Sequence, residues 1–176
     1  LHFSHDESNQ FSISANSITD IVKLNNGELW VSTYHKGLNK LNDDLTFSRF
    51  LPNEHQPELG PSSDHILKII EDEFGHLWFA TYGGGLNRMD LDTKMFSHLT
   101  HDETNSESIS SDLSWIVFRD NAGNLWAGTQ AAGLNFLSIE NQRNQDYRFE
   151  RFNVKDGMKS RTVYGISEDK ENNIWF

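Results

Sequence analysis

The 176-residue sequence predicts an all-β fold built from repeated four-stranded antiparallel sheets. The first observation is a heptapeptide that recurs as GELWVST, GHLWFAT and GNLWAGT, with a shortened fourth copy, NNIWF, at the end of the chain. Its tryptophans, Trp30, Trp78, Trp126 and Trp175, lie 48, 48 and 49 residues apart. The second observation is a Gly-Leu-Asn tripeptide that begins four residues after the threonine of each complete copy. Such a period indicates one structural unit repeated along the chain.

Each unit contains segments with strand character. The first is a short run rich in Ile and Val, bounded by turn residues, as in strands. These runs are Ser17–Leu24, His65–Asp72, Leu113–Asp120 and Thr162–Asp169. A tight turn follows, with Gly27 in the first unit and Asn172 in the fourth, because hairpin turns require positive φ. The Leu-Trp segment is the second strand. The third begins at Gly-Leu-Asn, and the fourth reads FSRF, FSHL or FERF.

Four short strands in about 48 residues are typical of one blade of a β-propeller. The expected blades are 17–50, 65–99, 113–152 and an incomplete 162–176. Propellers generally need four to eight blades to close. We therefore expect residues 1–176 to form one propeller fragment, an open arc that is part of a longer protein.

The recurring tryptophan is expected to pack between neighbouring blades. Side chains alternate along a strand, so Trp30 and Ser32 face one way while Leu29, Val31 and Thr33 face the other. The residue two positions after the tryptophan stays small, as Ser32, Ala80 and Gly128. This leaves room for an indole to fill the space between blades. Burial of each ring is expected to stabilise the fold by up to a few kcal/mol.

Composition excludes several classes of function. There is no cysteine, so disulfides, thiolate metal sites and cysteine nucleophiles are excluded. The formal charge of −11 disfavours binding of nucleic acid.

The HDE tripeptides at His5–Glu7 and His101–Glu103 lie two units apart, so we expect loop anchors rather than metal ligands. Gly83–Gly85 is expected to be a hairpin loop. No catalytic residue and no cofactor is predicted.

Binding residues are expected on the loops at one face of the blades. There, the loops between the second and third strands meet the connections from one blade to the next. Tyrosines beside polar groups suit sugar rings, which have apolar faces and hydroxyl rims. The candidates are Tyr34, His35, Lys36, Asp64, His65, Tyr82, Asp112, Gln130 and Arg161, with Asn16 beside them.

The segments DEFGHLWFATYGGGLNRMD and DNAGNLWAGTQAAGLNFL resemble the two-component regulator propeller repeat, roughly eDxxGxLWxGTxxGGLxRYD. DGMKSRTVYGISED and the HDESNQFSISANSI segment resemble its inter-blade connections. The resemblance implies the periplasmic, extracytoplasmic sensor region of a bacterial inner-membrane signalling protein. The implied output domain is a histidine kinase or a GGDEF diguanylate cyclase, and the implied stimulus is often a carbohydrate.

The expected function is therefore a non-catalytic sensory module that binds an oligosaccharide or another small ligand. We also expect self-association or dimerisation, and contact with the membrane only through segments outside this chain. Two alternatives stay open: a structural dimerisation scaffold that binds no small molecule, and a propeller enzyme that acts on polysaccharide.

Overall fold

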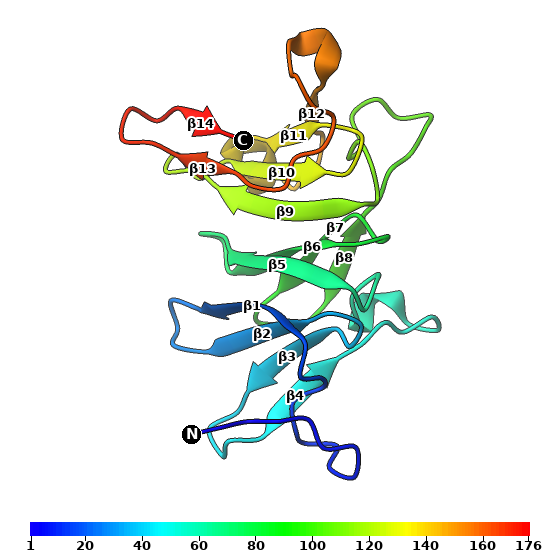
Figure 1. The fold of residues 1–176 in the computed structure, drawn as a ribbon, viewed down its shortest axis with the longest axis vertical. Coiled ribbons are helices and arrows are strands. Elements are labelled where there is room, and N and C mark those ends of the chain that lie inside the picture. Colours follow the sequence, from blue (N-terminus) through cyan, green and yellow to red (C-terminus); the bar gives the residue numbers. More distant parts are fainter.

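The structure is a computed structural model that describes all 176 residues. It contains three four-stranded antiparallel sheets and one two-stranded sheet, which follow one another along the chain (Figure 1). Each sheet is a meander in which sequential strands pair, and we call the sheets blades 1 to 4. Blade 1 consists of β1 (Ile18–Lys23), β2 (Leu29–Thr33), β3 (Leu38–Leu41) and β4 (Phe47–Phe50).

The other blades repeat this order. Blade 2 consists of β5 (Ile66–Glu71), β6 (His76–Thr81), β7 (Leu86–Asp90) and β8 (Phe96–Leu99). Blade 3 consists of β9 (Ser114–Arg119), β10 (Leu125–Thr129), β11 (Leu134–Leu137) and β12 (Glu150–Phe152). Blade 4 is the hairpin of β13 (Ser167–Glu168) and β14 (Ile174–Trp175). The short helices are η1 (Pro57–Leu59), α1 (Ile139–Arg143) and η2 (Val154–Asp156).

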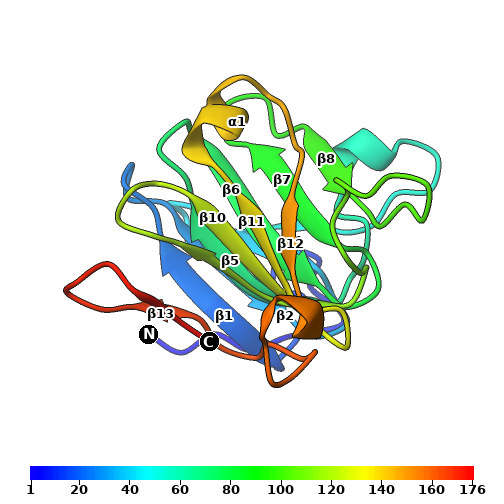
Figure 2. The same ribbon diagram turned by 90° about the horizontal axis from the view of Figure 1, so that it is seen from above.

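The blades are closest to one another at their first strands. β1 contacts β5 and β5 contacts β9, whereas no comparable contact joins the outer strands β4, β8 and β12. Figure 1 shows the inner strands one above another, and Figure 2 shows the sheets overlying each other, with α1 and η2 at separate edges. This arrangement confirms the predicted fold class, an open arc of propeller blades.

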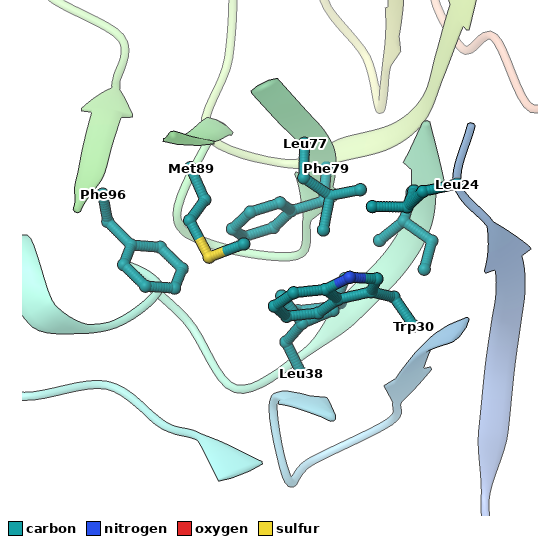
Figure 3. Packing of buried hydrophobic residues seen from close by; sticks show 9 residues of the cluster. Leu24, Trp30, Leu38, Leu77, Phe79, Met89 and Phe96 are labelled. Carbon is teal, nitrogen blue, oxygen red and sulfur yellow. The ribbon is translucent and has the colours of Figure 1, made fainter. Parts of the chain in front are cut away.

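The core lies between the blades, where the recurring tryptophans fill it. Trp30 is fully buried against Leu77, Phe79 and Met89 of blade 2 (Figure 3). Trp78 packs in the same way against residues of blade 3, among them Leu125. These contacts confirm that the indoles wedge neighbouring blades together.

The indole N–H groups have their own partners, which the sequence analysis did not identify. Asp72 lies six residues before Trp78, and its Oδ2 accepts the Nε1–H at 2.7 Å. Asp120 and Asp169 accept from their tryptophans at 2.9 and 2.7 Å. Blade 1 has Leu24 at the equivalent position, and there Glu28 accepts from Trp30 at 3.0 Å. Each blade therefore combines an apolar wedge with a hydrogen bond to a carboxylate.

Two segments differ from the predicted strands. The connection between β11 and β12 contains α1, which Ser138 caps by accepting the N–H of Asn141 at 3.1 Å. The first strand of the fourth unit was predicted at Thr162–Asp169, but only Ser167–Glu168 is a strand. In this hairpin Ser167 pairs with Trp175, and Glu168 pairs with Ile174.

Candidate binding site on the loop face

The loops β2–β3, β6–β7 and β10–β11 lie beside the connections that enter the next blade, and we call this side the loop face. Gly37 shows how they are joined. Its φ is +69°, its N–H donates to the carbonyl of Asp64 at 2.9 Å, and a Cβ would lie 2.3 Å from the carbonyl oxygen of Phe50. Only glycine fits this conformation and this contact. Gly85 and Gly133 donate equivalently to Asp112 and Arg161, at 2.9 and 2.7 Å.

The asparagine of Gly-Leu-Asn binds a second connection, the segment that leads into the first strand of its own blade. Asn39 Oδ1 accepts the N–H of Ser14 at 2.9 Å, and its Nδ2 donates to the Ser14 hydroxyl at 2.8 Å. Asn87 and Asn135 bind Ser62 and Ser110 in the same manner. The recurring tripeptide thus ties each loop to two connections, which makes the loop face a rigid frame for its exposed side chains.

Four predicted site residues meet at the boundary of blades 1 and 2. The ring centroids of His35 and His65 are 4.1 Å apart, and those of Tyr34 and His65 are 5.0 Å apart. The Nδ1 of His65 lies 2.7 Å from Oδ1 of Asp64. We call Tyr34, His35, Asp64 and His65 the first aromatic group.

His35 has a strained backbone, with φ at +78°. The equivalent residues in the next blades, Gly83 and Ala131, also have positive φ, at +95° and +64°. The loop therefore requires a left-handed residue, and blade 1 places a bulky imidazole where glycine is favourable. Strain of this kind is typical of functional sites.

A second aromatic group lies along blades 2 to 4 and consists of Tyr82, Trp115 and Tyr164. The ring centroids are 5.7 Å apart for Tyr82 and Trp115 and 5.2 Å apart for Trp115 and Tyr164, with edge-to-face geometry in both pairs. Only Tyr82 was predicted as a site residue. Trp115 is the fifth tryptophan and falls outside the 48-residue period, a signal that could have identified it.

The remaining predicted residues are placed separately. Lys36 and Arg161 are exposed on the loop face. Asp112 holds a loop, since its Oδ1 accepts the N–H of His101 at 2.7 Å. Gln130 is half-buried, and its Oε1 has no hydrogen-bond donor. Five of the nine predicted residues thus belong to the two aromatic groups and four lie apart from them. None of the nine lines the groove along the inner strands, which includes Ile21 and Ile70.

The HDE loops are anchors, as predicted. Nδ1 of His5 lies 2.8 Å from the carbonyl oxygen of Ile13, and Nδ1 of His101 lies 2.9 Å from that of Ile109. Outer-strand arginines hold the same loops: Arg49 donates to Ser12 O at 2.8 Å, and Arg151 to Ser108 O at 2.7 Å. The His, Asp and Glu side chains form no group of three that could hold a metal ion.

Comparison with solved structures supports the fold. The extracellular domain of the hybrid two component system BT4673 from B. thetaiotaomicron matches with a TM-score of 0.72 and 16% identity, over 98% of this chain and 23% of that one. The corresponding domain of BT3049 from the same organism matches with a TM-score of 0.65 and 21% identity, over 99% and 27%. This chain therefore spans about a quarter of the length of those domains.

A propeller enzyme has a similar fold. A catalytically inactive virginiamycin B lyase from Staphylococcus aureus, solved with quinupristin, matches with a TM-score of 0.63 and 13% identity, over 90% of this chain and 48% of that one.

No curated protein sequence matches the chain. None of its helices has the length and apolarity needed to cross a bilayer. In sequence, residues 12–35 and 60–83 match the family described as two component regulator propeller.

Proposed function

We propose that this chain is part of the extracytoplasmic sensory propeller of a bacterial membrane-bound two-component signalling protein, and that its loop face binds an oligosaccharide. The observation that carries the proposal is that two matched repeats hold aromatic and polar side chains together on one face. Sugar rings bind where aromatic faces lie beside hydrogen-bonding groups. The first group supplies Tyr34 with Asp64 and His65, and Lys36 lies next to it.

The proposed output domain is a histidine kinase rather than a diguanylate cyclase. The support is that two of the similar folds are extracellular domains of hybrid two component systems. In this proposal, binding changes the arrangement of the blades or of a dimer, and a membrane helix outside residues 1–176 transmits the change. The chain itself is proposed to carry out no catalysis.

The test uses the purified full-length protein and five probes: cello-, xylo-, manno-, arabino- and galactotetraose. We expect one of them to raise the melting temperature, because a ligand that binds only the folded state stabilises it. Isothermal titration then measures the dissociation constant of wild type and of a Tyr34→Gln variant, in which the residue found at position 130 replaces the tyrosine. We expect at least tenfold weaker binding by the variant. No binding of any probe to wild type would contradict the proposal.

The same samples separate the two alternatives. A propeller enzyme, which the fold of virginiamycin B lyase makes worth testing, would release shorter or unsaturated products from the tetrasaccharides, detectable by chromatography. A pure scaffold would dimerise in sedimentation experiments but show no change in melting temperature with any probe. We expect unchanged tetrasaccharides together with a shift in melting temperature.

A further inference from the structure

We propose that Trp115 is the stacking platform for one sugar ring of the bound oligosaccharide, with Tyr82 and Tyr164 as its side walls. This inference rests on the proposed function and assigns a specificity-determining residue that the recurring motif does not contain. The three rings come from three blades: Tyr82 follows β6, Trp115 is in β9, and Tyr164 precedes β13. Tyr82 and Tyr164 are 37% and 66% exposed, so the group faces solvent at the loop face.

The ring of Trp115 contacts aromatic residues of two other blades, but its N–H has no partner in the fold. The four periodic tryptophans each donate Nε1–H to a carboxylate. Nε1 of Trp115 is instead shielded from solvent and has no acceptor. The equivalent residues in blades 1 and 2 are Thr19 and Leu67, so a propeller blade does not require an indole at this position. An unpaired buried N–H is destabilising, so a ligand hydroxyl that accepts this hydrogen bond would stabilise the site.

Gln130 provides the complementary group at the boundary of blades 3 and 4. Its Oε1 is buried without a donor. The loop that carries it reaches blade 4, because the N–H of Ala131 donates to the hydroxyl of Thr162 at 3.2 Å, two residues before Tyr164. An indole donor in β9 and an amide acceptor in the β10–β11 loop therefore both lack a protein partner. A sugar hydroxyl can accept one hydrogen bond and donate another, so it matches both.

Tyr164 lies against one side of Trp115, with 5.2 Å between the ring centroids. Its ring is 66% exposed, more than that of Tyr82. Rotation of this ring away from Trp115 would uncover the indole face and its N–H. The bound sugar ring would then take the place of the edge-to-face contact between the two aromatic rings. The expected ligand is a pyranose with an apolar face and an equatorial hydroxyl directed to Trp115.

The experiment compares variants of the full-length protein with the tetrasaccharide that binds wild type. Trp115→Leu introduces the residue that blade 2 has at this position, so we expect it to fold, with a somewhat lower melting temperature without ligand because the contacts with Tyr82 and Tyr164 are lost. We expect its dissociation constant to rise at least tenfold, because it loses both the stacking surface and the N–H. Trp115→Phe keeps an aromatic face and is expected to bind with intermediate affinity. Fluorescence provides a direct readout, since the probe should change the emission of wild type but not that of Trp115→Leu.

The outcomes distinguish this inference from the proposed function. Unchanged binding by Trp115→Leu, together with loss of binding by Tyr34→Gln, would place the ligand at the first aromatic group. That result would overturn the role of Trp115 and leave the proposed function intact. If no tetrasaccharide binds wild type, both proposals fail.

Discussion

At the scale of single residues, the recurring tryptophan depends on a carboxylate as much as on its apolar neighbours. Burial alone raises the pKa of Asp72, but hydrogen bonds from His76 and Trp78 outweigh it, and the net pKa is lowered. In blade 4, the hydrogen bond from Trp175 lowers the pKa of Asp169 to about 2. The ionised carboxylate is therefore the form that the fold stabilises.

Replacing Asp72 by Asn tests this carboxylate. A lowered folded pKa means that the contribution to stability is present above the unfolded pKa of about 3.9 and is lost as pH falls through the folded value. We expect Asp72→Asn to reduce the free energy of unfolding at pH 7 by about 1.5–3 kcal/mol, because charge-assisted hydrogen bonds are lost. Urea denaturation at pH 7 and at pH 3 measures the free energy of unfolding of each variant above and below the unfolded pKa. An equal loss at the two pH values would contradict the ionic role, and Asp43→Asn, an exposed change, is the control.

His35→Gly separates stability from binding. Glycine adopts positive φ without a Cβ clash, so the variant should be more stable than wild type by about 1 kcal/mol. Loss of the imidazole should weaken binding of the tetrasaccharide at the first aromatic group. Thermal unfolding and titration measure the two effects. Ala131→Gly is the matched control, because it relieves the same strain in blade 3 without removing an imidazole. A destabilised His35→Gly would show that ring packing outweighs backbone strain.

At the scale of elements, the hairpins could be predicted from the sequence. Glycine recurs where a turn needs positive φ, and the asparagine of Gly-Leu-Asn recurs where a side chain binds the connection between blades. Helix α1 was missed because five residues carry no helical periodicity. The site was predicted only in part. Topology brings the loops to one face, but the contact of His35 with His65 depends on side-chain rotamers. Trp115 was not predicted because it lies outside the recurring motif.

The small residue two positions after each tryptophan limits how closely the next blade docks. At Gly128, a Cβ would lie 2.7 Å from Cγ1 and 2.8 Å from the carbonyl oxygen of Val163. We expect Gly128→Ala to weaken the docking of blade 4 by about 1–3 kcal/mol, the usual cost of overpacking. Faster hydrogen exchange at the amide of Val163, which donates to Thr129, would report it. Gly165→Ala is the control, because a Cβ there meets no atom within 4 Å. Equal exchange in both variants would refute the steric explanation.

At the scale of the whole molecule, the architecture was predictable because the chain repeats one unit. A strand assignment made for one unit applies to each of the others. Each blade contacts only its neighbours, so stability is expected to accumulate from one interface to the next. The interfaces are unequal along the chain. Trp30 and Trp78 are fully enclosed, Trp126 is half-buried, and Trp175 is 63% exposed. This gradient follows from how much of a following blade covers each ring.

The gradient predicts an ordered series of alanine substitutions. Trp78→Ala should lower the free energy of unfolding by about 3–5 kcal/mol, the range for large aromatic residues removed from a core. Trp126→Ala should lower it by roughly 1–3 kcal/mol, because less apolar area is lost. Trp175→Ala should stay within about 0.5 kcal/mol of wild type, as for exposed positions. Urea denaturation of residues 1–176 followed by far-ultraviolet circular dichroism measures all three. Equal losses at the three positions would contradict stabilisation by the indole wedge, because the same ring would then contribute equally with and without a blade to cover it.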